Sequence, residues 1–133
     1  MEEYLKETKY LDFNEVSIKK AVNDITKNLR VDKEIAIAIH DYVRETILFG
    51  FNRKFYNLKA SEVLESRIGF CNNKTTLFIS MLRCAGIPAR CVFVDINKQI
   101  LAGIVDPRTD YVDHSYSEVF LNNKWIRVDI VTL

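Results

Sequence analysis

Residues 69–90 decide the fold, and they read GFCNNKTTLFISMLRCAGIPAR. The first part predicts a helix over 71–84, because apolar residues recur there at helical spacing along one side. Those residues are Leu77, Phe78, Met81 and Leu82. Gly86 and Pro88 follow directly and are typical of a helix end. Residues 89–96 are rich in β-branched and apolar types, so we expect a strand that is buried on both faces.

Two helices are predicted upstream of this stretch. Apolar and polar residues alternate at helical spacing over 12–29, and Asp12 is expected to be the N-cap. A second helix is expected to start after Asp32 and to run to about Phe49. Its apolar residues cover a wide face, which predicts a well-buried helix. They are Ile35, Ile37, Ile39, Val43, Ile47 and Leu48.

Gly50 is expected to end the second helix. Residues 51–59 read as an aromatic-rich loop, and a short helix is predicted over about 60–66. With the strands described next, the chain has helices first and then an antiparallel sheet, which is the α+β class. A length of 133 residues suits one domain.

Two more strands, about 111–121 and 125–131, are predicted on either side of Asn122-Asn123. Asparagine tolerates the positive φ that a two-residue type I′ turn requires. That turn sets the opposed pairs, which are Leu121 with Lys124, Phe120 with Trp125, Glu118 with Arg127, and Tyr116 with Asp129. The aromatic pair and the ion pair each contribute about 0.2–1 kcal/mol. The reverse face is expected to meet the core, and it carries Val119, Leu121, Ile126, Val128 and Ile130.

His114 and Asp129 fall on one face of this hairpin. They are diagonal neighbours, about 7–8 Å apart at the backbone and within reach of each other's side chains. A slip of one residue would put them on opposite faces. The pattern therefore brings a histidine beside an aspartate, either as two polar residues on a solvated face or as part of a site.

The composition excludes several classes of protein. Hydrophobic residues make up 48% and charged residues 28%, which is ordinary for a globular domain, and the net charge of +1 gives no argument for a nucleic-acid or anionic-membrane partner. No apolar run reaches the roughly 18 residues of a membrane span, and the first ten residues, MEEYLKETKY, have no apolar stretch of a secretory signal. We expect a cytoplasmic protein, and the sequence leaves its oligomeric state open.

The three cysteines are Cys71, Cys84 and Cys91, an odd count that does not resemble a disulfide framework. Free thiols in a reducing compartment are expected. Cys71 lies at the predicted start of a helix, where the positive end of the helix dipole favours the thiolate and the first-turn amides can hold an oxyanion. Cys84 and Cys91 are interpreted as small core hydrophobes.

No metal site and no cofactor are expected. The spacings of thirteen and seven residues between the cysteines do not match those of zinc ligands. His40 is interpreted as a surface histidine or as one with satisfied hydrogen bonds on the second helix.

Three separated blocks resemble the core motif of transglutaminase-like domains. In the first, residues 69–90, a glycine precedes a cysteine, a long helix follows, and Gly-Ile-Pro-Ala-Arg leads into a strand. The second is HSYSEV at 114–119, and the third is KWIRVD at 124–129. The blocks occur in the order expected for that family, and residues 60–69, ASEVLESRIG, also fit it.

The resemblance covers about residues 34–131, which leaves 1–33 as a helical extension of a single domain spanning 1–133. It implies the papain-like α+β architecture of that superfamily. In that architecture, helices pack on a small antiparallel sheet, and the nucleophilic cysteine begins a helix.

The resemblance also implies a catalytic triad, with Cys71 as nucleophile, His114 as base and Asp129 as the residue that orients the imidazole. Such a triad transfers the acyl group of a peptide or protein amide through a thioester. Water as the acceptor gives a cysteine peptidase or amidase, and an amine gives a transglutaminase. We expect hydrolysis, by analogy with family members of simple architecture.

Four more residues are candidates for substrate contact or for the second oxyanion donor. Asn52, Tyr56 and Asn72 are polar and near the expected cleft, and Tyr116 stands where the family commonly has a tryptophan. Each is otherwise an ordinary loop, strand or helix-start residue. The connection over 97–110 is expected to be solvated, with a lid over the cleft as the alternative.

Two other functions remain open at this point. The first is a binding or scaffolding domain that has kept the fold and lost catalysis, although such a domain has no physical need for all three triad residue types. The second is an enzyme that takes its acyl group from acyl-coenzyme A, since arylamine acetyltransferases share this triad.

Overall fold

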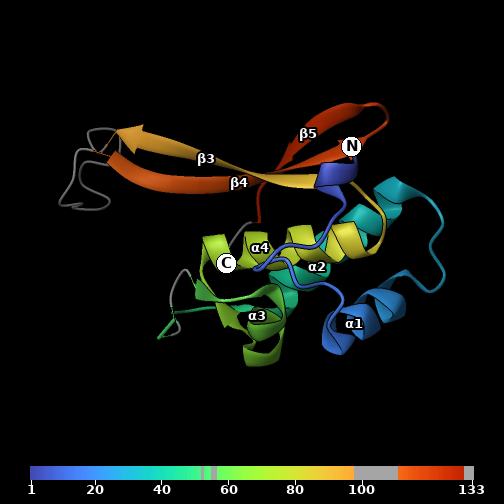
Figure 1. Cartoon of the computed structure of the whole chain (residues 1–133), viewed down its shortest axis with the longest axis horizontal. Helices are drawn as coiled ribbons and strands as arrows, with labels where there is room; N and C mark the ends of the chain where they lie inside the picture. Colours follow the sequence, from blue (N-terminus) through green and yellow to red (C-terminus); the bar gives the residue numbers. More distant parts are fainter. Residues whose placement is uncertain (52, 55–56, 98–110, 131–133) are drawn as a thin grey trace.

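The computed structural model describes residues 1–51, 53–54, 57–97 and 111–130, with the helices before the three-stranded sheet (Figure 1). The predicted α+β class is confirmed. The elements are η1 Glu2–Tyr4, α1 Val16–Thr26, α2 Asp32–Thr46, β1 Leu48–Phe49, α3 Ala60–Ser66, β2 Ile68–Gly69, α4 Cys71–Cys84, β3 Ala89–Asn97, β4 Tyr111–Leu121 and β5 Lys124–Val128. Among the described residues, no helix has the length and apolarity needed to cross a bilayer.

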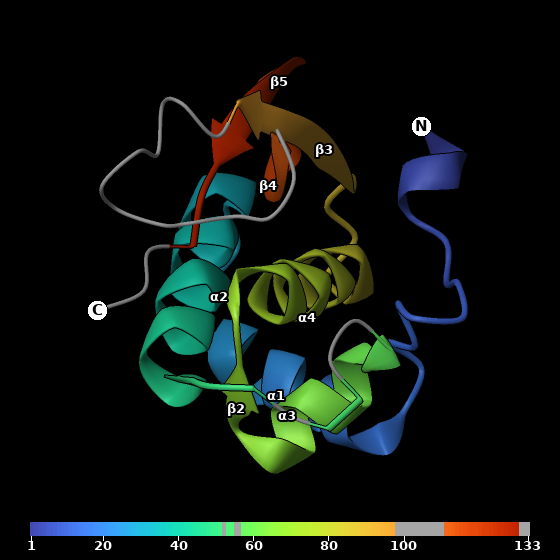
Figure 2. The ribbon, with the colours of Figure 1, turned by 90° about the vertical axis from the view of Figure 1, so that its left-hand side faces the viewer.

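Helix α4 is the centre of the molecule. Figure 2 looks nearly along it and shows α1, α2 and α3 around it, with the sheet on the remaining side. Its bounds are those predicted, and the four apolar residues expected to face the core are almost fully buried. Because partners surround α4, Ile79 and Ser80 on its other sides are buried as well.

The first long helix is shorter than predicted. Helix α1 begins at Val16, and its N-cap is Glu15 rather than Asp12. The Asp12 carboxylate accepts hydrogen bonds from the amide and the hydroxyl of Ser61, in the first turn of α3, with 3.0 Å between the amide nitrogen and Oδ1. Asp12 therefore caps a different helix, through a contact that local periodicity cannot reveal.

The second helix ends earlier than predicted. Helix α2 stops at Thr46, and Leu48–Phe49 form β1, which pairs in parallel with β2. Ile39, Val43 and Ile47 of the predicted apolar set are buried, but Ile37 is 51% exposed and Leu48 is 67% exposed. An apolar run such as the one after Thr46 fits a helix or a strand equally well. Here the pairing of β1 with β2 makes it a strand.

The sheet has the strand order β3-β4-β5, and both pairings are antiparallel. The hairpin register is confirmed from Leu121–Lys124 to Glu118–Arg127, and both Asn122 and Asn123 have positive φ, as a type I′ turn requires. The ladder ends at Ser117–Val128, so the expected pair of Tyr116 with Asp129 does not form within it.

The inner face of the hairpin meets the core, as predicted. Val119 and Ile130 are buried, and Leu121 and Val128 pack against the core at its margin. An apolar groove of about 300 Å³ remains between α2, α4 and this face.

One predicted ion pair on the outer face of the sheet, Glu118 with Arg127, is replaced by another. Glu118 and Arg127 are opposed in register, but Glu118 accepts from Arg90 of β3 at 2.8 Å. Because β4 is the central strand, Glu118 has a cation on each side, and Arg90 also lies 3.8 Å from the centre of the Trp125 ring. Phe120 and Trp125 form the predicted aromatic pair, with ring centroids 5.3 Å apart.

The first part of β3 is not buried on both faces, contrary to prediction. Arg90 is half-buried, and Cys91 is exposed. Arg90 pairs with Glu118 on the outer face of the sheet, which the α-helices do not cover (Figure 2). Cys91 lies on an edge strand, which has a neighbouring strand on one side only.

Candidate active site around Cys71

The turn that leads into α4 is tightly fixed. After β2, Gly69 packs so close to Asn73 that a Cβ added at Gly69 would lie 2.8 Å from the Asn73 Cβ. The Asn73 side chain is buried, and its Oδ1 accepts a hydrogen bond from the Phe70 amide at 3.1 Å. This is half of a capping box, and it holds the chain so that Cys71 is the first residue of the helix.

Cys71 is partly exposed at this helix start. Its sulfur lies 3.8 Å from Oδ1 of Asn72, the candidate residue next to it. The first amides of an α-helix have no partner within the helix, and the helix dipole makes this end positive. The geometry therefore suits negative charge at the sulfur and on an oxygen bound beside it.

The two other cysteines lie in different surroundings. Cys84, at the end of α4, packs against the core, and burial raises the pKa of its thiol. Cys91 was predicted to be a core residue and is exposed, yet desolvation of its sulfur raises the pKa of that thiol to about 11. All three cysteines belong to the described part of the chain, and none is in a disulfide.

Asp129 lies just after the end of β5 and is about half exposed. Its Oδ2 accepts from Nε of Arg127 at 3.3 Å. The guanidinium carbon of Arg127 lies 4.0 Å from the centre of the Tyr116 ring. The candidate residues Asp129 and Tyr116 are therefore linked through a cation on the outer face of the hairpin.

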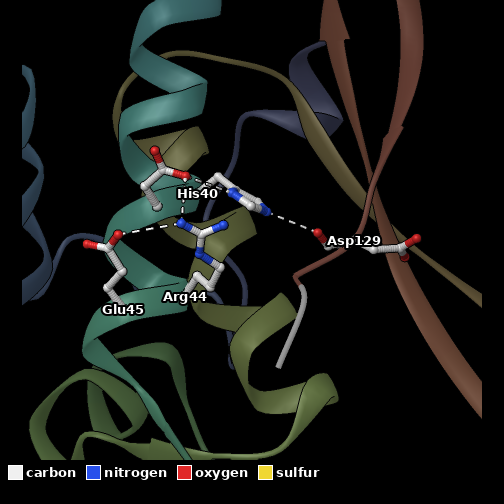
Figure 3. A network of polar contacts seen from close by, with 5 residues as sticks. His40, Arg44, Glu45 and Asp129 are labelled. Carbon is white, nitrogen blue, oxygen red and sulfur yellow. Dashed lines mark hydrogen bonds and ion pairs between the residues drawn. The ribbon is translucent and has the colours of Figure 1, made fainter. Parts of the chain in front are cut away.

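His40 holds the main chain at Asp129. Its Nε2 donates to the carbonyl oxygen of Asp129 at 3.0 Å, and its Nδ1 lies 3.3 Å from Oδ1 of Asp41. Figure 3 shows the imidazole reaching from α2 to the end of β5, with the Asp129 carboxylate directed to the other side of the strand. The ring also packs edge-on against Phe78, with centroids 5.8 Å apart. The interpretation of His40 as a satisfied helical histidine is confirmed.

The link from His40 to Asp129 has no signal in the sequence. The two residues are 89 positions apart, and no local pattern connects a mid-helix histidine with the residue after a strand. Only the packing of α2 beneath the hairpin brings them together.

The remaining candidates fall partly outside the described residues. His114 lies in β4, where its main chain pairs with Val94, but its side chain is outside the described part. Asn52, Tyr56 and residues 98–110 of the predicted connection lie outside it entirely. Over the described ranges, no hydrogen bond or ion pair joins Cys71 to Asp129, and no group of three or more His, Cys, Asp or Glu residues is arranged to hold a metal ion.

Comparison with solved structures supports the fold. A "Putative Cysteine Protease" from Cytophaga hutchinsonii has a TM-score of 0.76 and 20% identity, over 96% of this chain and 40% of that one. A "putative protease" from Parabacteroides distasonis has a TM-score of 0.65 and 16% identity, over 99% of this chain and 25% of that one. The periplasmic domain of TgpA from Pseudomonas aeruginosa has a TM-score of 0.64 and 18% identity, over 95% of this chain and 44% of that one.

The chain therefore spans less than half the length of each of these three structures. No curated protein sequence matches it. The family model of the transglutaminase-like superfamily matches residues 19–130, which is most of the chain and begins within α1. The chain belongs to the transglutaminase-like superfamily.

Proposed function

We propose that this chain is a thiol-dependent acyl-transfer enzyme in which Cys71 attacks an amide carbonyl. The observation that carries the proposal is the position of Cys71 as first residue of a fourteen-residue helix, in a chain of this superfamily. The positive end of such a helix stabilises a thiolate and the oxyanion that its attack creates. His114 is proposed as the base and Asp129 as the residue that orients its ring.

The proposed reaction has two stages. The Cys71 sulfur forms a bond to the carbonyl carbon, the carbon–nitrogen bond breaks, and His114 gives its proton to the departing amine. The thioester is then attacked by water, which releases a carboxylic acid and restores the thiol. We favour water as acceptor and a peptide or protein amide as substrate, in line with the protease descriptions of two similar structures.

The first test is the rate of alkylation by iodoacetamide at each cysteine, located by mass spectrometry. Because their pKa values are raised, Cys84 and Cys91 are mostly protonated at neutral pH and should react slowly. Cys71 should be labelled first, and His114→Ala should slow the alkylation of Cys71 but not that of the other two cysteines. The proposal fails if Cys71 is labelled no faster than the other two or is indifferent to His114→Ala.

The acceptor is tested next, with a peptide library offered with and without a labelled primary amine. Free carboxylic acid in both reactions supports hydrolysis, and incorporation of the amine identifies a transglutaminase. Cys71→Ala is the control for both products. An acyl-enzyme formed only from acyl-coenzyme A would assign the acetyltransferase alternative instead.

A catalytically inactive binding domain is the second candidate, and one observation favours it. The Asp129 carboxylate is bonded by Arg127 on the outer face of the hairpin. This candidate predicts the failed outcome of the alkylation test. The cytoplasmic location expected from the sequence stays a prediction, since one of the similar structures is a periplasmic domain.

A further inference from the structure

Helix α4 buries two cations, Lys74 and Arg83, which are 2% and 8% exposed. A buried charge is costly unless it is paired or hydrogen-bonded, so each of these residues requires a compensating partner. The partners of the two residues differ in kind.

Arg83 has a structural explanation. Its Nε donates to the carbonyl oxygen of Ala89 at 2.9 Å, and its Nη1 donates to the carbonyl oxygen of Lys6 at 2.9 Å. These bonds tie the end of α4 to the start of β3 and to the N-terminal segment. The guanidinium charge is therefore compensated by fixed main-chain dipoles.

Lys74 has no such explanation. Within the described part of the chain, neither a carboxylate nor a carbonyl oxygen pairs with its ammonium group. It lies three residues after Cys71 in the first turn of α4, a spacing that puts two Cβ atoms on one helix face about 5–6 Å apart. Helical side chains lean toward the N-terminus, which is the direction of Cys71.

The electrostatics of Lys74 point to the same neighbour. Burial lowers the pKa of its ammonium, and negative charge on Cys71 acts in the opposite direction and raises it. The Cys71 sulfur is the only anionic group that acts on Lys74 in this way among the described residues. Among the described residues, Cys71 is therefore the neighbour whose negative charge acts on the Lys74 ammonium.

We propose that the Lys74 ammonium is the counter-ion of the Cys71 thiolate, a role that rests on the proposed acyl-transfer function. The coupling is reciprocal, because an ammonium that is stabilised by a thiolate stabilises the thiolate by the same free energy. Because Lys74 is buried, the attraction is stronger than between two exposed charges. Lys74 thus adds to the helix dipole in stabilising negative charge at the Cys71 sulfur, and it acts through Cys71 as a positioning residue.

The test replaces Lys74 by Met, which keeps a side chain of similar length and shape and removes the charge. Cys71 alkylation is measured against pH in the wild-type chain and in Lys74→Met, with thermal unfolding in parallel. In Lys74→Met, the midpoint of the alkylation curve should move to higher pH, and the rate at neutral pH should fall about tenfold for each pH unit moved. The melting temperature should stay the same or rise, because the desolvation cost of the ammonium is removed and the Cys71 thiolate, left without its counter-ion, can take up a proton.

Arg83→Met is the matched control, since it removes the other buried cation of the same helix. It should lower the melting temperature and leave the Cys71 alkylation midpoint in place. Added salt should change the wild-type midpoint little, because a partly buried pair is screened less than an exposed pair.

Two outcomes would overturn the proposal. The first is an unchanged alkylation curve in Lys74→Met. The second is a joint loss of alkylation and of thermal stability, which would make Lys74 a structural residue like Arg83. Failure of the proposed function itself would appear separately, in the wild-type chain, as Cys71 labelling no faster than Cys84 and Cys91.

Discussion

Gly69 fixes the path of the turn that leads into Cys71, because there is no room for a side chain at this position. A Cβ there would lie 2.8 Å from the Asn73 Cβ, which belongs to a buried residue of α4. Gly69→Ala must therefore shift the turn that holds Cys71. We expect it to lower the free energy of unfolding by about 1–3 kcal/mol, as overpacking does. It should also slow Cys71 alkylation, and both effects can be measured on one preparation.

Gly50→Ala provides the comparison for this prediction. Its Cβ would meet Cγ2 of Ile68 at 2.7 Å, but that methyl belongs to an exposed side chain that can turn about χ1 toward solvent. The loss of stability should be smaller, and Cys71 alkylation should not change. Equal effects of the two variants would show that the contact with Asn73 does not control the turn.

Sequence patterns predict correctly that Cys71 begins a helix, and they predict the surroundings of this residue less well. The start of α4 at Cys71 was predicted because Gly69, Gly86 and Pro88 bracket one strong helical period. The exposure of Cys91 was not predicted, since an apolar strand in isolation does not reveal whether it lies at an edge of the sheet. Lys74 reads as an ordinary solvated lysine until the helix is seen to be surrounded.

The β4–β5 hairpin is an element whose register rests on its turn. Asn123 has φ of 64°, a conformation that costs a side chain with a Cβ about 1–2 kcal/mol and a β-branched one more. Asn123→Gly should therefore leave the free energy of unfolding within about 0.5 kcal/mol of wild type, whereas Asn123→Val should lower it by about 1–2 kcal/mol or more. Urea unfolding compares the two, and equal stabilities would contradict a type I′ turn.

A hydrogen bond from His40 links α2 to the end of β5. His40→Ala removes the bond to the Asp129 carbonyl and the contact with Phe78, and it should lower the free energy of unfolding by about 1–3 kcal/mol. Arg44→Ala, one helical turn on, removes only the ion pairs with Asp41 and with Glu45, and it should cost less than about 0.5 kcal/mol. Figure 3 shows the pair with Glu45. Similar losses in chemical denaturation would mean that His40 does not anchor the strand.

Element boundaries were predictable where strong local signals exist. Helix α3 matches its predicted range, and the main chain turns into αL at Arg67 directly after it. The end of α2 was missed because an apolar run after Thr46 can continue a helix or begin a strand. Pairing with Ile68 and Gly69, twenty residues away in the chain, decides between them.

At the scale of the whole molecule, burial of α4 makes the stability of the fold depend on pH. The elements packed around this helix place the Cys84 thiol at the margin of the hydrophobic core and bury the side chain of Lys74. Groups of this kind have different pKa values in the folded and unfolded chains, and each such difference becomes a slope of stability against pH.

Above neutral pH, the thiols and the lysine change the free energy of unfolding in opposite directions. Between about pH 9 and 11, folded Cys91 keeps a proton that the unfolded chain has lost, so this thiol lowers stability as pH rises, and Cys84 acts in the same direction. The lowered pKa of Lys74 means that the cost of its buried charge is fully present at neutral pH and is relieved as pH rises toward its unfolded value of about 10.5.

Because folded Cys91 resists losing its proton, Cys91→Ala should gain stability relative to wild type as pH rises. Lys74→Met should be the more stable chain at neutral pH and lose that advantage in alkali, as followed by urea midpoints across the range. A constant difference between Lys74→Met and wild type would mean that Lys74 has the same pKa in the folded and unfolded chains, and that its ammonium is not held in the core beside Cys71.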